Sequence, residues 1–104
     1  MLEKAAVEKL NAVERRYLDL GAEMEKPEVS GDYQLLQEVN RERSGLEDVV
    51  TAYADYRQIQ AQIADARELV ESGDAEMGAL AKDELESLST RAESVEARLR
   101  ELLL

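Results

Sequence analysis

Apolar residues recur at every third or fourth position along three stretches of this 104-residue chain. This spacing is typical of an α-helix that buries one stripe of its surface. The first stretch consists of Leu2, Ala6, Leu10, Val13, Tyr17, Leu20 and Met24. The second consists of Leu46, Val49, Tyr53, Tyr56, Ile59, Ile63, Ala66 and Val70, and the third of Met77, Ala81, Leu85, Leu88, Ala92, Val95, Leu99 and Leu102. No segment shows the alternation of a half-buried strand, so the chain is predicted to be all-α.

The only proline of the chain, Pro27, interrupts the helical pattern after the first stripe. Proline lacks a backbone donor and disfavours helical geometry at the preceding residue, so a first helix over residues 2–25 is expected to end there. Ser30 is a favoured N-cap residue, and a second helix is predicted over residues 30–43. The apolar residues of this second helix are Tyr33, Leu36 and Val39.

Two further sites carry the signals of a helix boundary. The sequence S-G-L-E at residues 44–47 matches a capping box, S-x-x-E. Either a new helix begins there or one long helix bends, and we favour a new helix over residues 45–71. Gly73 suits the left-handed position after a helix and Asp74 suits an N-cap, so the last helix is predicted over residues 74–103.

Each long helix has an apolar stripe that it cannot bury alone. Helices joined by short turns fold back on one another in antiparallel pairs, which covers these stripes. We therefore predict one helical domain over residues 1–104, an elongated antiparallel bundle of three long helices with a short extra helix. Tyr17, Tyr53 and Tyr56 lie on the stripes and are expected to be core residues.

The composition excludes several kinds of chemistry. Because the chain has no cysteine and no histidine, it has no disulfide, thiol or imidazole chemistry. Carboxylates are abundant, but adjacent ones such as Asp83 and Glu84 point about 100° apart on a helix. Glu93 and Glu96 share a face, which is expected to be solvated and opposite the apolar stripe. We predict no catalytic, cofactor-binding or metal-binding residues, and therefore no enzyme.

Acidic residues outnumber basic ones by 24 to 13, which gives a net charge of −11. This balance argues against stand-alone nucleic-acid binding, because phosphate contact requires clustered positive charge. The local basic residues suit either contact with RNA phosphates or an acidic partner, or surface ion pairs, and we favour ion pairs. These residues are Arg15, Arg16, Arg41 and Arg43, and the expected partners are Asp19, Glu38, Glu42 and Glu47.

The two ends of the sequence carry information on location and extent. Charged residues such as Lys4 and Glu8 interrupt the N-terminal segment, so no signal peptide is predicted, and no apolar run approaches the roughly 20 residues of a membrane span. A cytoplasmic protein without a membrane partner is expected. The chain closes on three leucines, an awkward end for a polypeptide, so we expect it to continue beyond Leu104.

Four short motifs resemble those of a known family. D-A-E-M at residues 74–77 is similar to the family's D-P-E-M-like turn, and L-A-K-D-E-L at residues 80–85 to its M-A-x-x-E-L helix. The leucines at 102–104 resemble the start of its L-L-L-P-K-D-P linker, and K-P-E-V at 26–29 resembles D-P-E-V. On these motifs the chain resembles the N-terminal helical domain of the bacterial release factor 1 family. Arg43 departs from the family, in which many members have tyrosine.

The resemblance implies a function in translation termination. Family members recognise the stop codons UAA and UAG and trigger peptidyl-tRNA hydrolysis through a G-G-Q loop. Neither that loop nor the codon-reading P-x-T element occurs in this chain. The resemblance therefore implies a monomeric docking module that reaches the stalk base of the ribosome and packs with the rest of the release factor. Release factor 2 has a similar domain, and the closing leucines favour the first factor.

Two alternative functions remain open. One is an unrelated helical adaptor or coiled-coil oligomerisation module, which would form a stable parallel dimer. The other is an acidic inhibitor that mimics RNA, and only the net charge supports it.

Overall fold

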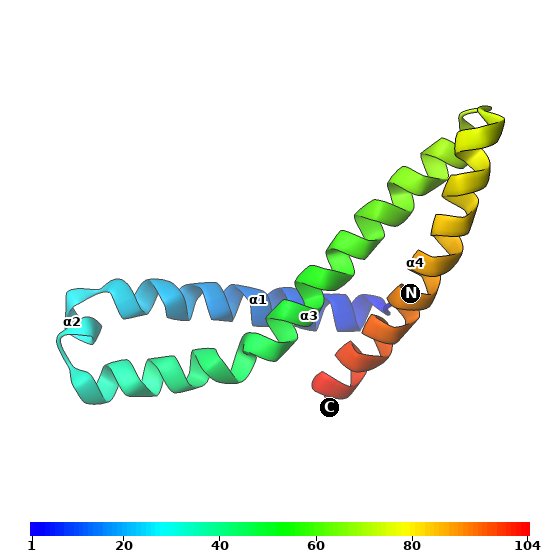
Figure 1. Cartoon of the computed structure of the whole chain (residues 1–104). Coiled ribbons are helices and arrows are strands. Elements are labelled where there is room, and N and C mark those ends of the chain that lie inside the picture. Colours follow the sequence, from blue (N-terminus) through cyan, green and yellow to red (C-terminus); the bar gives the residue numbers. More distant parts are fainter. The chain divides into compact units, whose positions relative to one another are not determined.

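The computed structural model describes all residues from Met1 to Leu104 and contains four helices (Figure 1). They are α1, Lys4–Glu25; α2, Pro27–Ser30; α3, Tyr33–Glu71; and α4, Ala75–Leu102. No residue lies in a β-strand. The prediction of an all-α fold with three long helices and one short helix is confirmed, but the short helix lies at Pro27–Ser30, and the residues predicted as the short helix, 30–43, belong mostly to α3. None of these helices contains an apolar stretch long enough to cross a bilayer.

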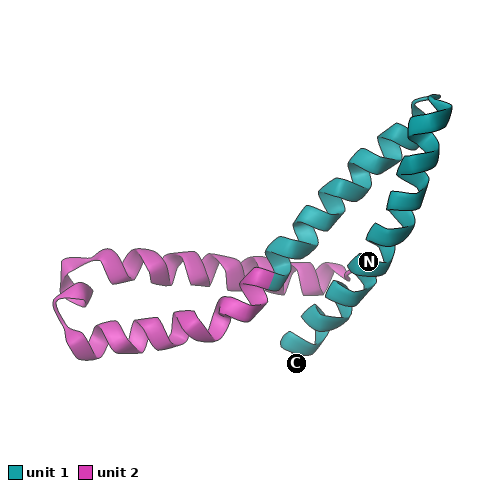
Figure 2. Cartoon of the chain, in the orientation of Figure 1, with its two compact units in different colours: residues 1, 52–102, 104 teal, residues 2–51, 103 magenta.

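The chain divides into two compact units (Figure 2). Unit 2 comprises residues 2–51 and Leu103, and within it the first part of α3 runs antiparallel to α1. Unit 1 comprises Met1, residues 52–102 and Leu104, and within it α4 runs antiparallel to the rest of α3. Each unit is therefore built on a hairpin of two helical segments, and α3 contributes to both.

Pro27 ends α1 as predicted, but it also begins the next helix. Lys26 has extended backbone angles, with φ −69° and ψ 135°, and Pro27 takes the first position of the single-turn helix α2. Proline is favoured at this position because its missing N–H has no partner within a helix. Gly31 closes the turn, where a Cβ atom would lie 2.9 Å from the carbonyl oxygen of Pro27. A side chain does not fit there without a shift of the backbone.

The predicted cap of the following helix was wrong. Ser30 is the last residue of α2 and not an N-cap, because the helical turn that begins at the proline already includes it. Asp32 takes this place: its Oδ1 accepts a hydrogen bond from the backbone N–H of Leu35 at 3.1 Å. This is the usual geometry of an aspartate that caps a helix N-terminus. α3 accordingly begins at Tyr33, three residues later than predicted.

α3 continues through Ser44 and Gly45, where a boundary between two helices was predicted. A glycine inside a helix costs about 1 kcal/mol relative to alanine. Val39 is buried in the core of unit 2 and Leu46 packs against that core, so apolar burial continues on both sides of the glycine. Because such burial outweighs the glycine cost, the capping box does not interrupt the helix.

The turn between α3 and α4 is formed as predicted. Gly73 adopts the left-handed conformation, with φ +86°. The Oδ1 atom of Asp74 accepts a hydrogen bond from the backbone N–H of Met77 at 2.9 Å, and α4 begins at Ala75. This aspartate is therefore the predicted N-cap.

The buried residues of each unit follow the apolar stripes. In unit 2 one core cluster consists of Leu20, Val29 and Val39, with Met24, Leu36 and Leu46 packed against it. In unit 1 one core cluster consists of Ile59, Ile63, Ala66, Ala81, Leu88 and Ala92, with Leu85 and Val95 packed against it. Tyr53 and Tyr56 are buried, as predicted, and Tyr17 is half-buried.

Candidate functional site

One of the predicted ion pairs joins α1 to α3 within unit 2. The Nε atom of Arg16 donates to Oε2 of Glu42 at 2.6 Å, and Nη2 donates to Oε1 at 2.8 Å. This hydrogen bonding is the main reason that the pKa of Glu42 lies below its ordinary value and that the pKa of Arg16 is raised. The planar guanidinium and the carboxylate meet through two parallel bonds, a specific geometry. The ion-pair interpretation of Arg16 is therefore confirmed.

Arg43 packs on a tyrosine and makes none of the ion pairs described for unit 2. Its guanidinium carbon lies 4.3 Å from the centroid of the Tyr17 ring, a distance at which a cation is attracted to the ring face. Gly21 lies one helical turn after Tyr17, and a Cβ atom there would come within 3.4 Å of Nε of Arg43. The glycine therefore leaves room for the guanidinium between the helices. The Nε atom is buried and has no hydrogen-bond partner.

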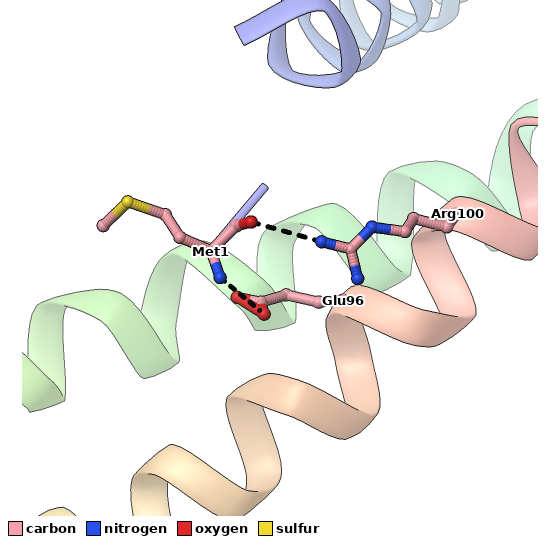
Figure 3. A network of polar contacts seen from close by, with 3 residues as sticks. All are labelled: Met1, Glu96 and Arg100. Carbon is pink, nitrogen blue, oxygen red and sulfur yellow. Dashed lines mark hydrogen bonds and ion pairs between the residues drawn. The ribbon is translucent and has the colours of Figure 1, made fainter. Parts of the chain in front are cut away.

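Glu96 is a buried carboxylate, whereas the sequence predicts it on a solvated face. Its side chain is only 6% exposed, and its Oε1 accepts a hydrogen bond from the α-ammonium group of Met1 at 3.0 Å (Figure 3). Arg100, one turn further along α4, donates from Nη2 to the carbonyl oxygen of Met1 at 3.2 Å (Figure 3). The sequence signal for the burial of Glu96 is its helical spacing, because it lies four residues after the buried Ala92 and three before the buried Leu99.

The surroundings of Glu96 are not those of a typical ligand site. The hollow beside it has a volume of about 180 Å³, below the roughly 300 Å³ at which ligand pockets begin. The structure holds no group of three or more aspartate or glutamate side chains that could bind a metal ion. The predicted lack of catalytic and cofactor-binding residues stays a prediction.

The end of the hairpin in unit 1 departs from the predicted apolar stripe of α4. Met77 opens the stripe of α4 in the sequence, yet its side chain is 45% exposed, and Leu80 is 63% exposed. Leu69, at the end of α3, is 37% exposed. These large apolar side chains are exposed near the turn at Gly73 and Asp74, so this end of unit 1 is the candidate interaction surface of the chain.

Comparison with known proteins decides the family. A family model described as the PCRF domain matches residues 13–104, which is most of the chain. The chain belongs to the PCRF domain family.

The proteins to which this chain is similar are peptide chain release factors. The chain is 43% identical over 97 residues to peptide chain release factor 1 of Acidobacterium capsulatum, a match that covers 93% of this chain and 27% of the relative. The release factor 1 of Streptococcus agalactiae is 40% identical over 99 residues, covering 93% and 28%. That of Oceanobacillus iheyensis is 39% identical over 99 residues, covering 94% and 28%. No solved structure matches the chain.

These matches confirm the resemblance to release factor 1, and they also show that it extends over only part of the relatives' length. This chain spans little more than a quarter of the length of the curated relatives that it matches. In the structure the motif at residues 74–77 is the turn that Asp74 caps, and the motif at residues 80–85 contains the exposed Leu80 and the buried Ala81. Two of the four motifs that carry the resemblance, at residues 74–77 and 80–85, therefore lie at the hairpin end of unit 1.

Proposed function

We propose that this PCRF domain is the docking module of a peptide chain release factor in translation termination, in the cytoplasm. The observation that carries the proposal is the identity of about 40% to release factor 1 proteins along 93% of the chain. The chain contains no G-G-Q loop and no P-x-T element. Recognition of UAA and UAG and peptide hydrolysis are therefore assigned to other parts of such a factor, and this chain is no enzyme.

The proposed partners are the ribosome, at its stalk base, and the rest of the release factor. The arrangement of the basic residues supports docking without stand-alone RNA binding. Arg16 is held by two hydrogen bonds from its guanidinium to Glu42, and Arg43 is packed on Tyr17, so both cations are engaged inside unit 2. A cation that is already engaged in this way is less available for phosphate contact.

We assign units 1 and 2 to one helical domain, over residues 1–104, and to a monomer. α3 runs through both units without interruption, so the loss of helix in one unit would destabilise the other. Thermal unfolding of the full chain should give one transition in circular dichroism, and sedimentation at micromolar concentration should give one monomeric species. A stable dimer would instead favour the helical adaptor or coiled-coil module.

Ribosome binding tests the docking function. The full chain is mixed with 70S ribosomes and pelleted through sucrose, with an equally acidic unrelated protein as the control. We expect the chain to pellet with the ribosomes and the control to stay in solution. A chain that remains in the supernatant at all concentrations contradicts the proposed function.

A further inference from the structure

The end of unit 1 leaves apolar side chains in solvent because the two helices lie very close together there. A Cβ atom on Gly78 of α4 would be 3.8 Å from the carbonyl oxygens of Leu69 and Val70 in α3. Ala66 in α3 and Ala81 in α4 are the buried residues that lie nearest the turn between these helices. Side chains this small leave no space between the helices for a leucine or methionine. The larger side chains of this end must therefore lie on the flanks of the hairpin.

Helix geometry places Leu69, Met77 and Leu80 on the same flank of the hairpin. Val70 lines a shallow hollow on one flank together with Lys82. Leu80 precedes Lys82 by two positions, which is about 160° around the helix, and so lies on the opposite flank. Met77 lies three residues before Leu80 and shares its side. Leu69 lies about 100° from Val70, on the side away from the hollow.

The charge of unit 1 is concentrated at the same end. Residues 65–86 contain eight acidic side chains and two basic ones, all exposed, whereas the other residues of unit 1 contain four of each. The acidic ones are Asp65, Glu68, Glu71, Asp74, Glu76, Asp83, Glu84 and Glu86, and the basic ones are Arg67 and Lys82. The whole net negative charge of the unit therefore lies within these residues.

The two basic residues of this end lie away from the apolar side chains. Arg67 lies two positions from Leu69, and Lys82 two positions from Leu80, so each faces the other flank. Asp65, by contrast, lies four positions before Leu69, and Glu84 lies four positions after Leu80, so each of these acids shares the side of its leucine. We use the name acidic apolar flank for the surface on which acids alone accompany the exposed apolar residues. It consists of Asp65, Leu69, Met77, Leu80 and Glu84.

We infer that the acidic apolar flank docks a basic protein surface, one with exposed apolar side chains among lysines and arginines. Nucleic acid and anionic lipid headgroups carry the same sign of charge as the flank and are repelled. A second copy of the chain would bring the same eight carboxylates and is repelled too. The apolar side chains add burial to this electrostatic complementarity. The inference rests on the proposed docking function and names the surface that performs it.

Matched variants of the full chain test the flank. Leu80→Ser removes an apolar side chain that is 63% exposed, and Leu18→Ser removes one that is 65% exposed on α1. Glu84→Lys reverses a charge on the flank, whereas Glu86→Lys makes the same change in net charge two positions away, on the other side of α4. Binding of each fluorescently labelled chain to 70S ribosomes is measured by anisotropy at low and at physiological salt.

We expect Leu80→Ser to weaken binding about tenfold, the change that corresponds to 1.4 kcal/mol of lost burial, and Leu18→Ser to leave it unchanged. Glu84→Lys should weaken binding about fivefold at low salt and less at physiological salt, because salt screens the attraction. Glu86→Lys should have a smaller effect. If the wild-type chain binds but the two leucine variants are equal, the flank is wrong and the proposed function stands. If the wild-type chain does not bind, the proposed function itself fails.

The class of the partner is tested by cross-linking. A photoreactive benzoylphenylalanine replaces Leu80 in one sample and Leu18 in the control, and the cross-linked ribosomal component is identified by mass spectrometry. We expect position 80 to cross-link to a lysine- and arginine-rich protein segment and position 18 not to do so. A cross-link to ribosomal RNA, to an acidic protein or to a second copy of the chain overturns the inference.

Discussion

The contact between Arg43 and Tyr17 decides whether a prominent basic residue belongs to the fold or to an RNA-binding surface. A double-mutant cycle of Arg43→Met, Tyr17→Leu and the double variant measures it, because each change keeps apolar bulk while it removes the charge or the ring. The guanidinium carbon is 4.3 Å from the ring centroid, and both side chains are half-buried. Cation–π contacts range from about 0.5 kcal/mol when exposed to about 2 kcal/mol when desolvated, so we expect a coupling of about 1 kcal/mol.

Urea unfolding of the full chain, followed by circular dichroism, gives the free energy of unfolding of each variant. The control cycle pairs Tyr17→Leu with Arg41→Met, because Arg41 is exposed and lies two positions from Arg43 on the same helix. We expect the control coupling to stay within about 0.3 kcal/mol of zero. Equal coupling in the two cycles would mean that Arg43 does not pack on the ring, and the interpretation of the basic residues as phosphate ligands would have to be reconsidered.

Four further substitutions, at three sites of the fold, are tested by unfolding measurements. Ile59→Ala empties a site with no solvent exposure and should cost about 3 kcal/mol. Gly31→Ala places a Cβ atom 2.9 Å from the carbonyl oxygen of Pro27 and should cost about 1–3 kcal/mol. The pKa of Glu42 is lowered in the folded chain, so its ion pair stabilises the fold above the ordinary carboxyl pKa and is lost as the pH falls through the lowered value. Glu42→Gln should remove this contribution to the pH dependence of the free energy of unfolding, and Arg16→Gln should do the same.

The controls for these changes use matched positions. Leu18→Ala alters an exposed leucine and should change the free energy of unfolding by less than about 0.5 kcal/mol. Gly45→Ala introduces a Cβ atom with no neighbour within 4 Å, inside α3, and should stabilise the chain by roughly 0.5–1 kcal/mol. The same substitution therefore has opposite signs at Gly31 and Gly45. Equal effects at the two glycines would contradict the close approach to Pro27.

Much of the fold could be predicted because its signals are local. The end of α1 at Pro27 and the turn at Gly73 follow from the backbone chemistry of single residues. The boundary expected near Gly45 is absent, because a local capping signal competed with burial that continues on both sides. Such a competition depends on tertiary packing, which a local sequence motif does not contain.

The candidate surface could be predicted only in part. Counting apolar positions assigned Met77 to the buried stripe, but the close approach of the helices at Gly78 leaves it exposed. The spacing of apolar residues in the sequence does not determine the distance between two helices. It therefore cannot predict where along a helix the apolar side chains become exposed. Glu96 shows the reverse error, since a carboxylate on a buried stripe was assumed to be solvated. Its position between Ala92 and Leu99 was the better guide.

Replacement within a complete release factor tests the central claim most directly. A release factor 1 relative is prepared intact, without the segment that aligns with this chain, and with this chain in place of that segment. Peptide release from ribosomes stopped at UAA is measured against factor concentration, and the 104-residue chain alone is included. We predict that deletion raises the half-saturating concentration, that replacement restores it, and that the chain alone releases no peptide. Release by the chain alone, or a replacement no better than the deletion, would contradict a non-catalytic docking domain.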